Sequence, residues 1–184
     1  MTSLLFSEPQ WPLAANAFLR PLRVADAEVV FGTVTSNREW LRTWLPWVDH
    51  THSALDSRFF IEDAHLRQQR GERFVLGIWV GEELAGCVGL NEVVAEHRRA
   101  TLGYWLAAKF CGQGLMTQAV QMLTEYALGE LDLYRLEIVC AVDNYASRAV
   151  AERCGYAQEG TLAAYLWQHG QPVDVALYVK IVKQ

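Results

Sequence analysis

The chain has 184 residues, of which 52% are hydrophobic, and a formal net charge of −5 at neutral pH. This length and apolar content suit one domain with a substantial core, and we expect residues 1–184 to form a single domain. The net negative charge argues against nucleic acid as a direct partner, because neutralising phosphates requires a basic face.

The N-terminal part of the chain predicts an arm, one strand and three helices. Residues 1–16 carry two prolines and little periodicity, which indicates a loose arm, and nothing there resembles a secretion signal. A strand is expected at 18–23, with Pro21 at a sheet edge or an early break, and helices at 27–33, 37–45 and 57–69. Asp26 is expected to cap the first helix, and Gly71 to end the third.

Three tryptophans lie close together in and just after the second expected helix. Trp40, Trp44 and Trp47 alternate with Arg38 and Arg42. Aromatic faces and two cations could wall a substrate groove. The competing interpretation is an aromatic stripe that faces the core at helical spacing, and it is favoured for at least one of the three.

The second half of the chain alternates strands with helices. Strands are expected at 73–80, 84–91, 101–106, 134–142, 156–167 and 173–182, with turns at 81–83 and 169–172. The helix after Gly114 has an apolar face formed by Met116, Ala119, Val120, Leu123 and Ala127. This helix and the strand after it predict a βαβ crossover from the strand at 101–106.

The turn before that helix carries the strongest functional signal. Gly112 and Gly114 permit backbone conformations closed to residues with a Cβ, and they let a ligand approach the main chain. The first N–H groups of the helix lack intrahelical partners, so the turn can bind a phosphate or pyrophosphate, with Lys109 adding a charge. An ordinary tight turn explains the glycine pair equally well. The P-loop and dinucleotide motifs are excluded, since Gly-Lys-Ser/Thr and a third glycine are both missing.

A second helix start follows the strand at 134–142. Asn144 fits the N-cap, Ser147 the N3 position and Gly155 the left-handed residue after the helix. These assignments account for the asparagine and the glycine without any function.

The remaining composition gives negative indications. No run of about 18 apolar residues occurs, so no membrane partner is expected. Cys87, Cys111, Cys140 and Cys154 form no Cys-x-x-Cys pair or ligand cluster, so no metal is expected. Three of them lie in apolar segments, which predicts reduced, mostly buried thiols in a cytoplasmic protein.

Taken in order, these patterns resemble the GNAT superfamily of acetyl-CoA-dependent N-acetyltransferases. Within it the chain is similar to the RimJ/RimL-type enzymes, which acetylate protein N-termini, including those of ribosomal proteins. The local matches are Arg42-Thr43-Trp44-Leu45-Pro46-Trp47, Gly103-Tyr104-Trp105-Leu106, Gly112-Gln113-Gly114-Leu115-Met116 and Asp143-Asn144-x-x-Ser147. The resemblance runs from about Phe18 to the C-terminus. It departs at Lys109, where Gln or Arg is usual, and near Leu166, where some relatives carry a glutamate proposed as the base.

The resemblance implies an α+β fold with three layers. Its sheet would be mixed and strongly twisted, with about six or seven strands and helices on both faces. The acetyl-CoA-binding core would cover about residues 72–156, and the N-terminal helices would form one wall of the acceptor groove. Enzymes of this type are often dimers, which suggests a homodimer.

The resemblance also implies roles for individual residues. A neutral amine would attack the thioester directly, the backbone N–H of Leu106 would face the oxyanion, and Ser147 would protonate the leaving thiolate. The alternative for Ser147 is a simple polar residue in the first turn. Acetyl-CoA would contact Tyr104, Trp105, Leu106, Lys109, Cys111, Gly112, Gln113, Gly114, Leu115, Met116 and Asn144. The acceptor would meet Arg38, Trp40, Arg42, Trp44, Trp47 and Glu92, the last through a water chain that removes a proton.

The expected acceptor follows from the cost of deprotonation. An α-amino group has a pKa of about 7.8, whereas a lysine amine has one of about 10.4 and is far harder to deprotonate at neutral pH. With no carboxylate at the family's base position, the α-amino group of a protein or peptide N-terminus is the better fit. Small amines, free amino acids and a non-catalytic acyl-CoA-binding module remain as alternatives.

Overall fold

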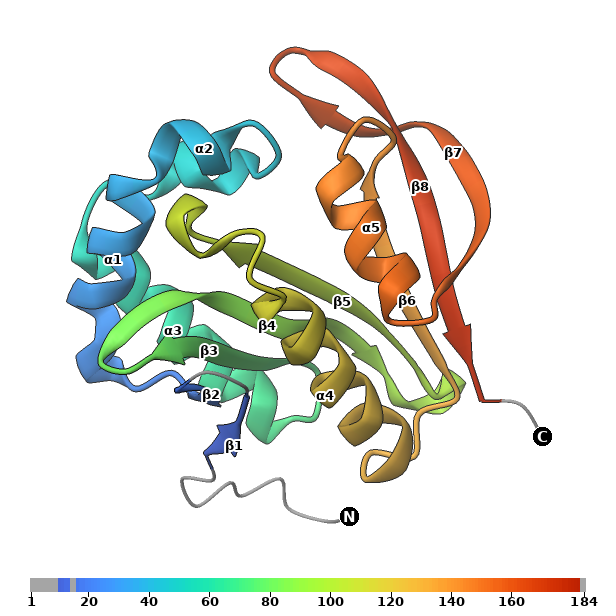
Figure 1. Cartoon of the computed structure of the whole chain (residues 1–184), viewed down its shortest axis with the longest axis horizontal. Coiled ribbons are helices and arrows are strands. Elements are labelled where there is room, and N and C mark those ends of the chain that lie inside the picture. Colours follow the sequence, from blue (N-terminus) through green and yellow to red (C-terminus); the bar gives the residue numbers. More distant parts are fainter. Residues whose placement is uncertain (1–9, 14–15, 183–184) are drawn as a thin grey trace.

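The computed structural model describes residues 10–13 and 16–182, and within them a mixed sheet of eight strands with five α-helices (Figure 1). The strands are β1 (Trp11–Pro12), β2 (Ala17–Pro21), β3 (Phe74–Val80), β4 (Glu83–Val94), β5 (Arg99–Leu106), β6 (Arg135–Ala141), β7 (Ala157–Gln168) and β8 (Gln171–Ile181). The helices are α1 (Ala27–Ser36), α2 (Arg38–Arg42), α3 (Ala54–Gln69), α4 (Leu115–Gly129) and α5 (Tyr145–Arg153). The order in the sheet is β1-β2-β3-β4-β5-β6-β8-β7. The mixed sheet expected from the resemblance is confirmed, with one strand more than the largest expected number.

The additional strand lies in the segment expected to be a loose arm. Trp11 pairs with Leu19, and its ring packs edge-on against Phe74 and Tyr126 at centroid distances of 6.5 and 6.2 Å. Burial of this large aromatic ring explains why residues 11–12 are ordered against β2. The expectation of a loose arm is wrong there, and residues 1–9 and 14–15 lie outside the described residues.

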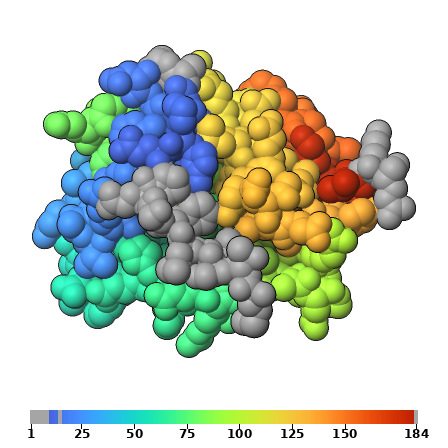
Figure 2. Space-filling view, turned by 90° about the horizontal axis from the view of Figure 1, so that it is seen from below, coloured from blue at the N-terminus to red at the C-terminus, as the bar shows by residue number. Residues whose placement is uncertain are grey.

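Helices cover both faces of the sheet. One core cluster joins α4 and α5 to the sheet, and a second joins α1, α2 and α3 to its other face. Successive residues of β3 alternate between them, with Leu76 and Ile78 in the first cluster and Val75 and Trp79 in the second. Figure 2 shows α4, in yellow to gold, at the surface between the N-terminal strands in blue and the C-terminal strands in orange and red. In the described part of the chain, no helix is long and apolar enough to cross a membrane.

Asp26 stabilises the start of α1 differently from the expectation. Its carboxylate makes no capping bond to α1, and it accepts instead from the N–H of Arg23 at 2.7 Å. The same carboxylate pairs with the Arg20 guanidinium at 2.6 and 2.9 Å, and Arg20 stacks 3.9 Å from the ring centroid of Trp79. The Asp26 carboxylate therefore pairs with the half-buried Arg20 guanidinium instead of capping α1 as the sequence predicts.

The crossover that contains α4 creates the opening in the sheet. The βαβ prediction is confirmed, because β5 and β6 are parallel and are the only parallel neighbours among the described strands. Their pairing ends at Leu102 and Ile138, although β5 continues to Leu106. Figure 1 shows the two strands diverging from that point, with the N-terminal ends of α4 and α5 on either side of the gap.

Candidate active site

Two cavities of about 520 Å³ each lie against the end of β5 and share part of their lining. The first cavity lies in the gap between β5 and β6, and its lining includes Trp40, the glycine turn and Ser147. The second cavity lies under α1 and α3, and its lining includes Trp47, Ser57 and Arg73. Leu45, Tyr104 and Trp105 line both.

The glycine turn has the conformation that its sequence requires. Gly112 and Gly114 both have a φ of +76°, in the left-handed region that side chains disfavour. Gly114 is the N-cap of α4 and offers no side chain to the first N–H groups of the helix. Gly112, Gly114, Leu115 and Met116 all line the first cavity. Uncapped N–H groups at the positive end of a helix therefore face this cavity, as an anion site requires.

The polar side chains of the turn lie elsewhere. The Lys109 ammonium pairs with the Glu83 carboxylate in the β3–β4 hairpin, and Gln113 donates to the Lys109 carbonyl at 2.9 Å. Neither residue lines the first cavity, whereas the exposed Cys111 does. The cation that does line it is Arg153, whose Nε donates to the Thr117 hydroxyl at 3.1 Å. No motif marked Arg153 in the sequence.

Asn144 and Ser147 are held as the N-cap prediction requires, which the structure confirms. The Asn144 side chain accepts from the Ser147 N–H at 3.0 Å. The Ser147 hydroxyl is not used in the cap, because it lies 2.9 Å from the Tyr104 hydroxyl and shares a hydrogen bond with it. Burial raises the pKa of Tyr104, so the phenol retains its proton. Two neutral hydroxyl groups therefore lie side by side in the first cavity.

The N–H of Leu106 points into the gap in the sheet. Ala107 donates its N–H to Ala85 of β4 at 2.8 Å, and adjacent peptide groups of an extended strand point to opposite sides. The Leu106 N–H and carbonyl therefore point away from β4. The carbonyl accepts from Trp40 Nε1 at 3.1 Å, which ties α2 to the end of β5.

All three tryptophans of the N-terminal segment line cavities. Trp40 and Trp44 line the first cavity, and Trp47 lines the second, where its ring centroid is 6.2 Å from that of Trp105. Trp40 is 47% and Trp47 is 40% exposed, so neither is a core residue. The groove interpretation fits their positions better than the core-facing stripe does.

Arg38 and Arg42 stabilise the segment that carries Trp47. Arg38 donates to the carbonyls of Val48 and Thr51, the latter at 2.6 Å, and Arg42 pairs with Asp49 at 3.1 Å. Neither arginine lines either cavity. Their placement is structural, and a direct contact with an acceptor stays a prediction.

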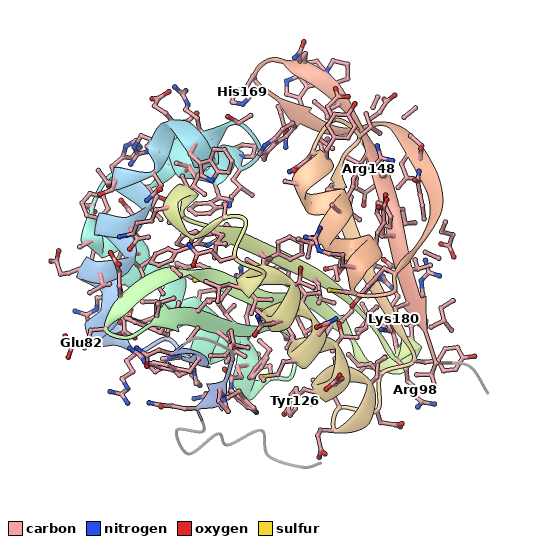
Figure 3. The ribbon with its side chains drawn as sticks, in the orientation of Figure 1. Glu82, Arg98, Tyr126, Arg148, His169 and Lys180 are labelled. Atoms are coloured by element: carbon pink, nitrogen blue, oxygen red, sulfur yellow. The ribbon has the colours of Figure 1, made fainter. Side chains whose placement is uncertain are left out.

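The β7–β8 hairpin reaches this same segment. His169 lies at its tip, beside the α2 region in Figure 3, with its Nε2 3.0 Å from the Arg42 carbonyl. Gln168 donates to the Trp44 carbonyl at 3.2 Å. The hairpin turn is His169-Gly170 alone, and Gln171 and Pro172, expected in the turn, already belong to β8. These contacts brace the segment that carries Trp44, which lines the first cavity, and Trp47, which lines the second.

The carboxylates near the second cavity differ in position. Glu92 is exposed, lies 3.9 Å from Arg99, and does not line the cavity, although its neighbour Asn91 does. Asp56 lines the cavity, but one of its oxygens accepts from the N–H groups of His52 and Ser53. The hydrogen bond from the His52 N–H and that from the Ser53 side chain lower the pKa of Asp56, which makes it a weaker base.

Two facing glycines belong to the lining of the second cavity. Gly89 of β4 pairs with Gly103 of β5, and both line the cavity. A Cβ at Gly103 would lie 2.0 Å from Nδ2 of Asn91. The missing Cβ at Gly103 thus leaves room for the Asn91 side chain, and Asn91 itself belongs to the lining.

A glycine turn at a helix start, beside parallel strands that diverge, defines an acyltransferase of the GNAT type. The chain belongs to that family, since the family model described as "Acetyltransferase (GNAT) domain" matches residues 16–157. It is therefore an N-acetyltransferase that uses acetyl-CoA.

Individual relatives refine this family assignment. The chain is 31% identical over 153 residues to the ribosomal-protein-serine acetyltransferase of Escherichia coli (strain K12), covering 83% of this chain and 86% of that protein. It is 28% identical over 160 residues to the spermidine N(1)-acetyltransferase of the same organism, covering 87% and 83%. Among solved structures, the ribosomal L7/L12 alpha-N-protein acetyltransferase RimL in complex with coenzyme A matches with a TM-score of 0.91 and 30% identity, covering 95% of this chain and 98% of that one.

Proposed function

We propose that this enzyme transfers the acetyl group of acetyl-CoA directly to the α-amino group of a protein or peptide N-terminus. The observation that carries the proposal is that two separate cavities have Tyr104 and Trp105 in common in their linings. A thioester in the first cavity and an amine in the second would meet there. Direct attack then needs no protein nucleophile.

The first cavity suits acetyl-CoA in three places. The pyrophosphate would accept from the N–H groups of residues 111–116, at the positive end of α4. The pantetheine arm would follow Gly103–Leu106, which lies beyond the last pair that β5 makes with β6, with Asn144 across the gap. Arg153 supplies a positive charge in the same lining.

The reaction would use one backbone group and two hydroxyl groups. As the neutral amine attacks, the carbonyl oxygen gains negative charge, which the Leu106 N–H would stabilise. The departing thiolate would take a proton from Ser147, Tyr104 would return one to Ser147 through their shared hydrogen bond, and the proton released by the attacking amine would restore the phenol through solvent. General acid catalysis of this kind is worth about 10²–10⁴-fold in rate.

The acceptor follows from the weakness of the available bases. An α-amino group is roughly 15% neutral at pH 7, whereas a lysine amine is almost entirely protonated. Asp56 is a weakened base, and Glu92 would act only through a water chain. An acceptor that needs little help suits this cavity, and the names of the RimL and ribosomal-protein-serine relatives support a protein N-terminus.

A polyamine is the second candidate acceptor, because one relative is named a spermidine acetyltransferase. The test is mass spectrometry after reaction with a peptide that carries both a free N-terminus and an internal lysine, with spermidine in a parallel reaction. We expect acetylation of the N-terminus. Acetylation mainly of the lysine, or of spermidine alone, would contradict the proposal. If no amine led to release of free thiol from acetyl-CoA, a non-catalytic acyl-CoA-binding module would be favoured.

We also propose a homodimer that acts in the cytoplasm. Tyr145, Tyr165 and Trp167 are 70%, 58% and 70% exposed, which gives α5 and β7 apolar surface for a second copy. The four cysteines are free, as a reducing compartment favours. Light scattering that detects only monomers would refute the dimer.

A further inference from the structure

Two buried hydrogen-bonding groups in the second cavity have no partner in the protein. Ser57 is 3% exposed and lines the cavity from the first turn of α3, and its hydroxyl makes no hydrogen bond. Arg73 lines the cavity just before β3, and its Nε is buried without a partner. Such groups are rare, because leaving one unpaired costs about 1–3 kcal/mol.

These two groups differ from the other unpaired atoms. Among the described residues, the remaining buried side-chain atoms without a partner are Arg42 Nε and Trp79 Nε1. Neither of those residues lines either cavity. Of the residues that the structure describes, Ser57 and Arg73 are therefore the two that both line one of these cavities and carry a buried side-chain atom without a partner.

Arg73 supplies a positive charge to the lining of the second cavity. Arg73 stacks 5.3 Å from the ring centroid of Phe60, and its single ion pair, with Asp63, is long at 3.4 Å. The other ionisable groups of the lining that face solvent are Asp56 and the exposed His50, and one Asp56 oxygen is committed to the start of α3. An arginine Nε can only donate, so a hydrogen-bond acceptor is the natural partner.

We propose that Ser57 and Arg73 form a subsite that binds an oxygen carried by the acceptor amine, either a peptide carbonyl or a carboxylate. This inference rests on the proposed function and deepens it. The subsite selects amines of the aminoacyl class, in which an oxygen acceptor lies a short distance from the reacting nitrogen. It disfavours polyamines, which would leave both donors unpaired and bring a second positive charge toward Arg73.

The test compares two acceptors that differ in one oxygen. The first is a short peptide with a free N-terminus, and the second is the same peptide with its first carbonyl reduced to a methylene. Each is assayed with the wild type, Ser57→Ala and Arg73→Lys, which keeps the charge but removes Nε as a donor. Since each acceptor is compared with itself across variants, the different amine pKa values cancel.

We expect Ser57→Ala to lower kcat/KM for the peptide by about 5- to 10-fold, mainly through KM, as the loss of one hydrogen bond predicts. Arg73→Lys should cost at least as much. Both variants should change kcat/KM for the reduced peptide by less than about twofold. Because the Ser57 hydroxyl has no partner to lose, Ser57→Ala should leave the melting temperature unchanged or raised. A fall in kcat/KM for this variant would then reflect weaker acceptor binding and not a less stable protein.

Matched controls are Ser36→Ala and Arg70→Lys, at exposed positions outside both cavities. Equal losses on the peptide and its reduced form, or no loss on either, would overturn the subsite. A wild type that acetylates other amines but not the peptide would overturn the proposed function and the subsite together. The free amino acid serves as a third acceptor: dependence on Ser57 there assigns the subsite to a carboxylate, and dependence with the peptide alone assigns it to a carbonyl.

Discussion

The two cavities have the same volume, about 520 Å³, but differ in the kind of groups that line them. The lining of the first includes the glycine turn and the start of α5, whose main-chain N–H groups can meet a ligand whatever side chains they carry, together with Trp40 and Trp44. The second is formed by side chains from α1, α3 and three strands. A main-chain N–H donor remains when its residue is replaced by any residue other than proline, whereas a side-chain group is lost. This difference would let a family keep one cofactor while its acceptors vary. Two relatives of this chain are indeed named for different acceptors, a ribosomal protein and spermidine.

Because the linings share few residues, we expect that separate substitutions can alter the acetyl-transfer step and the choice of acceptor. Only Leu45, Tyr104 and Trp105 belong to both linings. Changes in the first cavity should affect every acceptor equally. Changes in the second should affect acceptors unequally.

The largest effect is expected for Ser147→Ala. If Ser147 protonates the thiolate, turnover should fall by about 10²–10⁴-fold for every acceptor, with little change in CoA affinity. The cap should survive, because Asn144 accepts from the Ser147 N–H and not from its hydroxyl. The measurements are steady-state kinetics and CoA titration. A fall in turnover of less than about threefold would leave Ser147 as a simple first-turn residue.

Gly114→Glu should abolish most cofactor binding. The new carboxylate would lie at the start of α4, where the pyrophosphate is expected, and like-charge repulsion plus the strained φ of +76° should weaken CoA by about 100-fold or more. Titration calorimetry with CoA measures the loss. Gly32→Glu is the matched control, since a Cβ there meets nothing within 4 Å and the residue lines neither cavity. Unchanged affinity in Gly114→Glu would move the pyrophosphate away from this turn.

The first cavity was predictable from sequence because its constraints are local. Gly112 and Gly114 satisfy a backbone requirement within three residues, and Asn144 caps the N–H of Ser147. The side chain of Lys109 escaped prediction, because its partner Glu83 lies 26 residues away in the chain. Sequence patterns therefore predict the backbone conformation of such a site more readily than they predict the partners of its long side chains.

The second cavity was not predictable, because no pattern links its parts. Ser57 begins a helix and Arg73 precedes a strand, and only the packing of α3 on the sheet brings both to one space. The first cavity has one such non-local link as well, since the bond between Trp40 and the Leu106 carbonyl spans 66 residues. Asp26 shows a different limit, since Arg20 is near it in the sequence, yet no pattern indicated that the carboxylate would pair with this guanidinium and not cap α1.

The wall of the second cavity should weaken in Asp26→Asn. This change leaves the half-buried Arg20 without its carboxylate, and breaking such a pair costs about 3 kcal/mol. Although burial alone would raise the pKa of Asp26, the hydrogen bonds from Arg20 and the Arg23 N–H outweigh it and lower the pKa. The stabilisation is therefore fully present above about pH 4 and is lost as pH falls through the lower folded pKa.

Urea unfolding of the wild type and Asp26→Asn across pH 2–7 measures this contribution. The difference in unfolding free energy should be constant near neutral pH and shrink at the acid end. A difference that persists unchanged at the lowest pH would mean that the carboxylate charge is not what stabilises α1. Asp143→Asn serves as the exposed control.

The smallest effect is expected for Tyr104→Phe, and it tests which of two neighbouring hydroxyl groups gives up the proton. The phenol lies behind Ser147 in the proposed relay and donates nothing directly to the thiolate, so its removal should cost about the worth of one hydrogen bond, roughly 3- to 10-fold in turnover. Because Tyr104 lines both cavities, KM values for different acceptors should also be compared. The double variant with Ser147→Ala decides the order of the relay. If Ser147 is the direct donor, adding Tyr104→Phe to Ser147→Ala should cost little more, since the two act as a unit. A loss from Tyr104→Phe alone that exceeds the loss from Ser147→Ala would instead make the buried phenol, whose raised pKa keeps it protonated, the acid that meets the thiolate.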